Sequence, residues 1–441
     1  MMKLKDTFST NTNKTEWGLL VLHIVYFVLL LWIYTTYIID IYGYYGYINA
    51  FNINKMIISP FVIAASFVFL RNNGLPSYFF LNVIIASTIT PALVMFSGSD
   101  LPLSFIVVIW FAFAILAVVA RYSKLRMVEV RVIGAKIMMY WLAVLSLLLI
   151  ATIFAFGGGR FINFDLSLVY EFRRDAAANL PAIFGYLIAG FPKAIFPAGI
   201  VLSLLYRKWV LLLVFIFCDV MIFALASSKG TLFVPVVVIF AYWFSRYRRL
   251  SHLTMLGLIM VVIVGGLDFY LGRAGFGGIA GWFGDLFVRR ALLANVLITW
   301  VYYNFFSGNP YAYWANSKFT FGLVNNPYDL DIPELIGREV FGRPDMHANT
   351  GWIGSGMANA GYFGIVLYSV LIGLLLSLLD AYAKKLPPSV VVPLFLFTVL
   401  TATAGSDFSS LFLTHGLLML LILVVLLKPI EYANPNGGRS G

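Results

Sequence analysis

The chain has 441 residues, of which 61% are hydrophobic and only 11% are charged, and its mean hydropathy is +0.91. Soluble globular proteins average about 45–50% apolar and about 25% charged residues. This composition therefore excludes a soluble protein, and it is also far too apolar for a disordered or fibrous one. The single cysteine, Cys218, excludes a disulfide scaffold, a cysteine zinc site and an iron–sulfur cluster.

Apolar segments that could cross a membrane recur along the chain. A transmembrane helix needs about 20 mostly apolar residues, and twelve segments match this pattern. Their centres lie near residues 27, 63, 87, 110, 144, 197, 218, 238, 261, 369, 397 and 419. We predict an all-α polytopic membrane protein with about 12 transmembrane helices, which form a single transmembrane domain over residues 1–441.

The basic residues indicate the orientation of these helices through the positive-inside rule. With a cytoplasmic N-terminus, the inner loops contain basic runs such as Arg121–Arg131 and Arg246–Arg249. The short outer loops contain little beyond Lys55 and Lys229. We therefore predict that both termini are cytoplasmic. The net charge of +11 then faces anionic lipid headgroups, which explains it without nucleic acid.

Two predicted outer segments, residues 157–180 and 271–360, are much longer than a simple connection. Loops beyond about 15 residues are usually functional or disordered. These two are rich in aromatic residues and glycine, which is not the composition of disorder. We expect both to fold, and we expect Ala291–Phe306 to form an amphipathic or re-entrant helix at the membrane interface.

Arginine is concentrated in these outer segments. Its planar guanidinium binds phosphate oxygens in pairs, and lipid diphosphates present such oxygens at a membrane surface. The alternative is that these arginines pair with the many local carboxylates or with lipid headgroups. The residues predicted to bind a substrate diphosphate are Arg289, Arg290, Arg173, Arg174, Lys229 and Arg343.

Residues 343–356 form a second group, just before the predicted helix near residue 369. The N-terminus of that helix would point outward and favour an anion. His347 is a candidate general base near neutral pH, and Asp345 is the second candidate. The alternative is an ordinary hydrogen-bonded loop histidine. Glycines can let the backbone approach a ligand or another helix. The predicted contacts to a glycan or its surroundings are Asn349, Thr350, Gly351, Gly354 and Tyr303.

Several short motifs carry a family resemblance. They are Ser227–Gly230, the Arg289–Arg290 pair running into Phe305–Pro310, His347–Gly354, Ala358–Tyr362 and Thr414–Gly416. With a large outer loop before the last three spans, the whole chain resembles the O-antigen polymerases, which are oligosaccharide repeat-unit polymerases. The O-antigen ligases have a similar plan, and the motifs do not separate the two families.

The resemblance implies a GT-C-like glycosyltransferase of the bacterial inner membrane, with its active site on the periplasmic face. Such an enzyme polymerises undecaprenyl-diphosphate-linked oligosaccharides, which serve as both donor and acceptor. It implies no metal and no cofactor, and a chain-length-regulating co-polymerase as a possible partner besides membrane lipid. Fixed arginines can neutralise a leaving diphosphate in place of a metal. The alternatives are an O-antigen ligase with a lipid A core acceptor and a lipid-linked oligosaccharide transporter.

Overall fold

A computed structural model of the chain describes residues 9–126, 130, 132–162, 181–226, 232–245, 249–275, 280–315 and 317–429. Within these residues the fold is all-helical, and eight helices are long and apolar enough to cross a membrane. Five further apolar helices are shorter. Seven predicted span centres lie in long helices and the other five lie in the shorter ones. The polytopic helical class is therefore confirmed, and the count of twelve spans stays a prediction.

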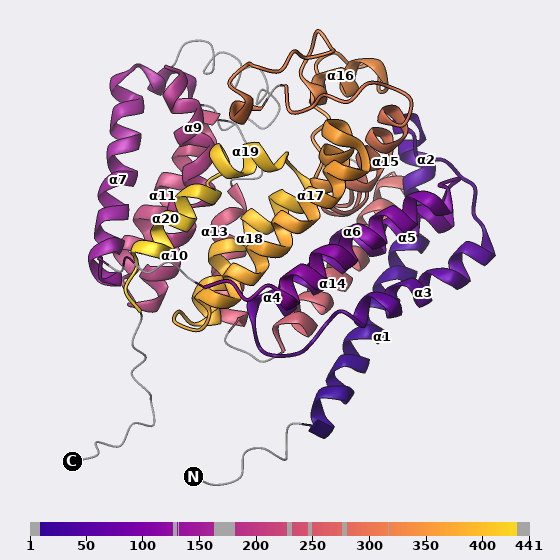
Figure 1. Cartoon of the computed structure of the whole chain (residues 1–441), viewed down its shortest axis with the longest axis horizontal. Helices are drawn as coiled ribbons and strands as arrows, with labels where there is room; N and C mark the ends of the chain where they lie inside the picture. The colour runs from indigo at the N-terminus through magenta and orange to yellow at the C-terminus, as the bar shows by residue number, and fades with distance from the viewer. Residues whose placement is uncertain are drawn as a thin grey trace. The chain divides into compact units, whose positions relative to one another are not determined.

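The helices gather into two compact units, whose elements are labelled in Figure 1. Unit 1 contains residues 1–124, 248–377 and 399–410. Unit 2 contains residues 125–247, 378–398 and 411–441. Each unit therefore combines segments that are far apart in the sequence.

Unit 1 is a bundle of apolar helices around one central helix. Its first members are α1 (Ser9–Ile33), α3 (Ile53–Phe67), α4 (Pro76–Ile84), α5 (Thr90–Gly98), α6 (Leu103–Tyr122) and α14 (Leu250–Arg273). α4 and α5 are parts of one long helix, Pro76–Gly98, whose apolar window is 89% buried, against 33% for α14. α5 packs on α1, α3 and α6, and Figure 1 shows α5 and α6 side by side. The α4–α5 helix is therefore the core of this unit.

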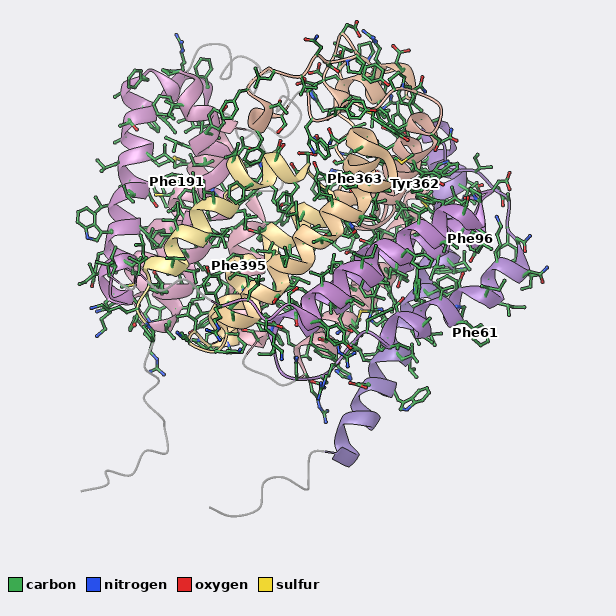
Figure 2. All side chains as sticks on the ribbon, in the orientation of Figure 1. Phe61, Phe96, Phe191, Tyr362, Phe363 and Phe395 are labelled. Carbon is green, nitrogen blue, oxygen red and sulfur yellow. The ribbon has the colours of Figure 1, made fainter. Side chains whose placement is uncertain are left out.

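The outward faces of these helices carry large apolar side chains. Phe61 on α3 is 71% exposed and Phe363 is 67% exposed, and Figure 2 shows Phe61 projecting from its helix. By contrast, Phe96 on α5 is buried. Exposed apolar faces of this kind are expected where lipid is the solvent.

Several helix ends meet at one end of unit 1. Arg273, the last residue of α14, forms an ion pair of 2.5 Å with Asp40, which belongs to α2 (Ile39–Tyr42). The Ala50 amide donates a 3.0 Å hydrogen bond to the carbonyl of Gly98, the last residue of α5. The first residues of α6 follow directly. We call this region, which contains Asp40–Ala50, Gly98–Leu103 and Arg273, the Tyr45 end of unit 1.

The helix Gly284–Phe306 lies across this end. It consists of η6 (Gly284–Leu293) and α15 (Ala294–Phe306), and it is the least apolar of the eight long helices. The Gly284 amide donates to Asp268 near the end of α14, at 2.8 Å. Near the other end, the Tyr303 ring lies 5.3 Å from Phe105 near the start of α6. The two ends of the helix therefore contact the last turns of α14 and the first turn of α6, and its interfacial or re-entrant placement stays a prediction.

α17 (Trp352–Tyr382) doubles back on itself. The Trp352 indole N–H donates to Ser369 Oγ at 3.1 Å, 17 residues away, whereas a straight helix would separate them by about 25 Å. The reversal lies at Ala360 and Gly361, and Gly361 has φ +60° and ψ −140°, a conformation that favours glycine. The first arm of α17 thus begins beside Ser369 and not at the end of the unit. The sequence predicts one helix here, whereas the structure has a helical hairpin whose second arm contains residue 369.

Unit 2 is a second helical bundle. Its helices include α7 (Ala135–Ala155), α9 (Ala182–Gly190), α10 (Ile195–Leu205), α11 (Trp209–Ala226), α13 (Val234–Phe244) and α20 (Leu417–Leu426). α10 packs against α7, α11 and α13. Asp219 on α11 is fully buried, and neither of its carboxylate oxygens bonds to a described residue. The predicted outer segment 157–180 is described only to residue 162, where η4 (Gly158–Phe161) forms a short 3-10 turn.

Candidate functional site

Three of the predicted diphosphate ligands, Arg173, Arg174 and Lys229, lie outside the described residues. The other three lie in unit 1. Arg289 and Arg290 are on η6, and Arg343 follows α16 (Ile332–Glu339).

One carboxylate holds the two consecutive arginines. Arg289 Nε lies 2.5 Å from Asp285 Oδ1, and Arg290 Nε lies 2.9 Å from Asp285 Oδ2. The local pairing that the sequence left open as an alternative is therefore present. It removes only one of the two positive charges.

Two tyrosines from the first span complete the group. The Arg289 guanidinium carbon lies 4.4 Å from the ring centre of Tyr42 and 4.8 Å from that of Tyr45. Arg343 lies 4.5 Å from the Tyr45 ring and donates to its hydroxyl at 3.0 Å. Cation–π contacts are worth about 0.5–2 kcal/mol each, depending on exposure. We call this set the arginine–tyrosine cluster: Tyr42, Tyr45, Asp285, Arg289, Arg290 and Arg343.

The three arginines differ in access. Arg289 is only 6% exposed, so its guanidinium is held against Asp285 and the tyrosine rings. The Arg290 side chain is 48% exposed, and Arg343 is exposed. Three guanidinium groups and one carboxylate leave two positive charges at the cluster. Arg290 and Arg343 are the groups that could contact an anion directly.

An apolar groove of about 450 Å³ lies between α1 and α14. Its walls include Trp32, Tyr37 and Leu267, and Gly266 lets the two helices approach closely. The ring centres of Tyr37 and Phe269 are 5.9 Å apart, and those of Phe269 and Tyr42 are 6.2 Å apart. The Tyr42 ring in turn contacts the Arg289 guanidinium. The buried Phe269 ring therefore connects Tyr37 in the groove wall to Tyr42 in the arginine–tyrosine cluster.

The two predicted acid–base residues lie on the segment between α16 and α17. His347 is 63% exposed, and its Nδ1 lies 3.5 Å from Glu334 Oε1 on α16. Asp345 is also exposed. The segment starts at Arg343 in the cluster and enters the unit at Thr350, at most about 25 Å away if extended. His347 thus lies, along the chain, between the cluster and a pocket inside the unit.

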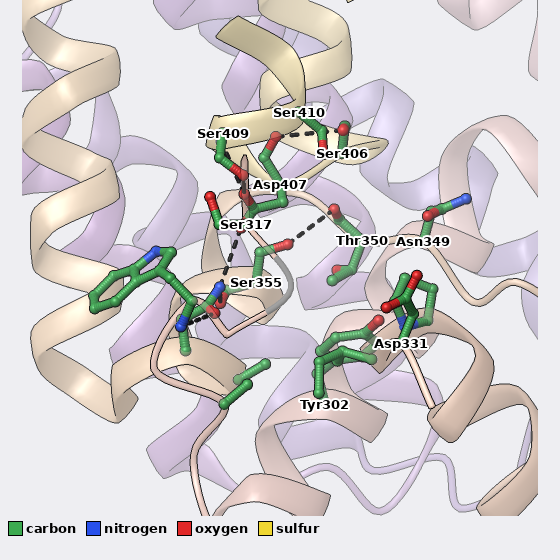
Figure 3. Close-up of a pocket in the computed structure, with 16 residues that line it drawn as sticks. Tyr302, Ser317, Asp331, Asn349, Thr350, Ser355, Ser406, Asp407, Ser409 and Ser410 are labelled. Carbon is green, nitrogen blue, oxygen red and sulfur yellow. Dashed lines mark hydrogen bonds between the residues drawn. The ribbon is translucent and has the colours of Figure 1, made fainter. Parts of the chain in front are cut away.

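That pocket has a volume of about 190 Å³ and is shown in Figure 3. Its walls come from α15, the first arm of α17, the segment before α16 and the start of α19 (Phe408–Leu413). They include two of the predicted glycan contacts, Asn349 and Thr350. The Tyr302 hydroxyl donates to the Ala348 carbonyl at 2.8 Å, which anchors this part of the chain to α15.

Asp407 organises one wall of the pocket. Its Oδ1 accepts from the Ser409 amide at 2.8 Å and from the Ser409 hydroxyl at 2.5 Å. Its Oδ2 accepts from Tyr368 at 2.6 Å and from Asn359 at 3.1 Å. The Trp314 indole N–H in turn donates to the Tyr368 hydroxyl at 2.8 Å. Neither lysine nor arginine occurs among the described lining residues.

The other predicted contacts lie outside this pocket. A Cβ atom on Gly351 would come within 2.0 Å of the Thr403 carbonyl oxygen, and one on Gly354 within 2.5 Å of Thr350 Oγ1. The chain itself therefore fills the space that these glycines leave. The Tyr303 hydroxyl shares a 3.0 Å hydrogen bond with Tyr362.

Sequence reasoning missed Tyr42, Tyr45, Asn359 and Tyr368 as members of these sites. The tyrosine run at residues 42–47 is a visible signal for Tyr42 and Tyr45, but such a run ordinarily indicates an interfacial aromatic belt. Asn359 lies in the motif Ala358–Tyr362, which by itself assigns it no role. Within the part of the chain that the structure describes, no group of three or more His, Cys, Asp or Glu side chains could hold a metal ion.

Comparisons with protein-family models, with curated proteins and with solved structures found no match for this chain. Its function must therefore be inferred from the chemistry of the site and from the sequence motifs.

Proposed function

We propose that this protein is a membrane-embedded glycosyltransferase that polymerises oligosaccharide repeat units linked to undecaprenyl diphosphate. One observation carries the proposal: the packed ring of Phe269 connects the arginine–tyrosine cluster to the wall of an apolar groove. A polyprenyl diphosphate has the same two parts, an apolar chain and an anionic head. Arginine suits such a head because its fork matches phosphate oxygens.

The arrangement suggests how the transfer would proceed. The acceptor hydroxyl attacks the anomeric carbon of the donor sugar, and the bond from that carbon to the diphosphate oxygen breaks. The electron pair leaves with undecaprenyl diphosphate, whose growing charge Arg290 and Arg343 would stabilise. The hydroxyl proton would pass to His347, and Glu334 at 3.5 Å would hold the imidazole ring in position.

The positive-inside pattern supports an orientation for this chemistry. With cytoplasmic termini in a bacterial inner membrane, the Tyr45 end of unit 1 would face the periplasm. The GT-C-like architecture and the twelve spans belong to the same proposal. An O-antigen ligase would use the same donor chemistry and differ in the acceptor.

The test is a polymerisation assay with purified full-length protein and the lipid-linked repeat unit of its native host. We expect a ladder of products that Arg290→Lys and Arg343→Lys both abolish, because lysine lacks the planar fork. Arg338→Lys is the matched control, since Arg338 is on α16 and pairs with Asp329 and Glu339. Full activity of both cluster variants would show that Arg290 and Arg343 do not form a diphosphate-binding clamp. Product formation only with a lipid A core acceptor would identify a ligase.

A further inference from the structure

The pocket beside Asp407 has a composition quite different from that of the arginine–tyrosine cluster. Asp331 and Asp407 both line it, without a basic residue among its described walls. Two carboxylates in a small pocket repel phosphate. A diphosphate therefore suits the cluster better than this pocket, which has room for an uncharged part of a substrate.

A bound cation is also a poor fit. An ionised carboxylate offers about four acceptor positions, and Asp407 already accepts four hydrogen bonds, from Ser409, Tyr368 and Asn359. Its oxygens are thus committed to the protein. The charge serves to hold one wall of the pocket in place.

The remaining walls suit an uncharged polyhydroxyl ligand. They present the Asn349 amide and the Trp314 side chain. The hydroxyls of Tyr302 and Thr350 bond to the Ala348 carbonyl and to Thr299, but each keeps acceptor positions for a ligand. Hydroxyls and amides both donate and accept, as sugar hydroxyls do. A volume of 190 Å³ equals that of about six liquid water molecules, which is room for one sugar ring.

We propose that this pocket binds one uncharged sugar ring of the lipid-linked glycan, with Asp407 as the positioning residue that holds Tyr368, Asn359 and Ser409. The inference rests on the proposed function and names a glycan subsite separate from the diphosphate site. Arg289 and Tyr302 belong to one continuous helix, and their Cα atoms are about 20 Å apart along its axis. A short oligosaccharide can bridge that distance.

Two ligands separate the sites in a binding experiment on full-length protein. One is undecaprenyl diphosphate, which has the anionic head without sugar, and the other is the lipid-linked repeat unit from the native host. Asn349→Ala and Asp407→Asn should each weaken binding of the repeat unit by about tenfold and leave binding of undecaprenyl diphosphate unchanged. Asp329→Asn, which alters a carboxylate paired with Arg338 outside the pocket, is the control and should affect neither ligand.

The outcomes distinguish this inference from the proposed function. Pocket variants that bind both ligands as the wild type does, or that weaken both equally, overturn the sugar subsite. Arg290→Ala should weaken both ligands, and an Arg290→Ala protein with unchanged affinities contradicts the diphosphate clamp instead. Asn349 is exposed, so its variant should fold even if Asp407→Asn does not.

Discussion

At the scale of single residues, Asp285 is the residue on which the arginine–tyrosine cluster depends. It bonds both Arg289 and Arg290, and the side chains of Arg289 and Asp285 are only 7% and 18% exposed. The cluster therefore concentrates positive charge where one carboxylate keeps it ordered. An anionic substrate would find Arg290 already oriented, which lowers the cost of ordering a flexible side chain on binding.

Asp285→Asn should destabilise the protein because it leaves the buried Arg289 without a counter-charge. Breaking one side of a buried pair costs about 3–5 kcal/mol, so a clear drop in the midpoint of thermal unfolding in detergent is expected. Asp40→Asn is the matched control, because the Arg273–Asp40 pair has side chains 41% and 63% exposed and such pairs contribute about 0–1 kcal/mol. Equal shifts for the two variants would show that Asp285 has no special role.

His347→Gln should lower the rate of transfer and leave substrate affinity almost unchanged. A positioned general base contributes about 10²–10⁴ in rate, while glutamine keeps a polar side chain of similar reach. Single-turnover rates and equilibrium binding of the lipid-linked repeat unit, measured separately, provide the test. A parallel loss of affinity would make His347 a substrate contact, and an unchanged rate would leave Asp345 as the candidate base.

At the scale of secondary structure elements, the hairpin of α17 places the pocket. Its first arm contributes Ser355, Ala358 and Asn359 to the walls, and its second arm contributes Tyr368, which bonds Asp407. The arms can meet because Gly356 and Gly364 face each other. A Cβ atom on Gly364 would lie only 2.1 Å from the Gly356 carbonyl oxygen.

Gly364→Ala should therefore separate the two arms and impair both stability and glycan binding. Overpacking of this kind costs about 1–3 kcal/mol, visible as a lower unfolding midpoint and weaker binding of the repeat unit. Gly257→Ala on α14 is the control, since a Cβ atom there meets nothing within 4 Å. If the two variants are equally stable and active, the arms of α17 do not pack as described.

The elements differ in how well the sequence predicts them. Apolar runs such as Leu103–Tyr122 are long enough to form a membrane-spanning helix without help from other segments, so hydropathy alone locates them. The hairpin is different, because it depends on the contact of Trp352 with Ser369, which no local pattern encodes. Likewise, Arg289 and Arg343 can be recognised from the sequence as phosphate-binding residue types. Their common contact with the Tyr45 ring depends on tertiary packing, which the sequence pattern does not show.

At the scale of the whole molecule, the topology depends on whether Gly284–Phe306 crosses the membrane. By length and composition it could cross, and the segment that follows it, including Arg343 and His347, would then change sides. Its contacts argue against this, because Gly284 bonds Asp268 and Tyr303 packs on Phe105. Asp268 lies five residues before the end of α14, and Phe105 lies two residues after the start of α6. Both of these helix ends are at the Tyr45 end, so we expect the arginine–tyrosine cluster and the His347 segment on one face.

Cysteine labelling tests this directly, because Cys218 is the chain's only cysteine and is buried. In a Cys218→Ala background, Asn54→Cys and Asn309→Cys should react with a membrane-impermeant maleimide from the same side of the membrane. Lys124→Cys, beyond the far end of α6, should react only from the opposite side, because α6 has 20 residues and a helix of that length spans about 30 Å. Labelling of Asn309→Cys from the side of Lys124→Cys would mean that η6 and α15 cross the membrane. The arginines on η6 would then lie at bilayer depth, where a charged clamp is costly, and the proposed face for catalysis would have to be abandoned.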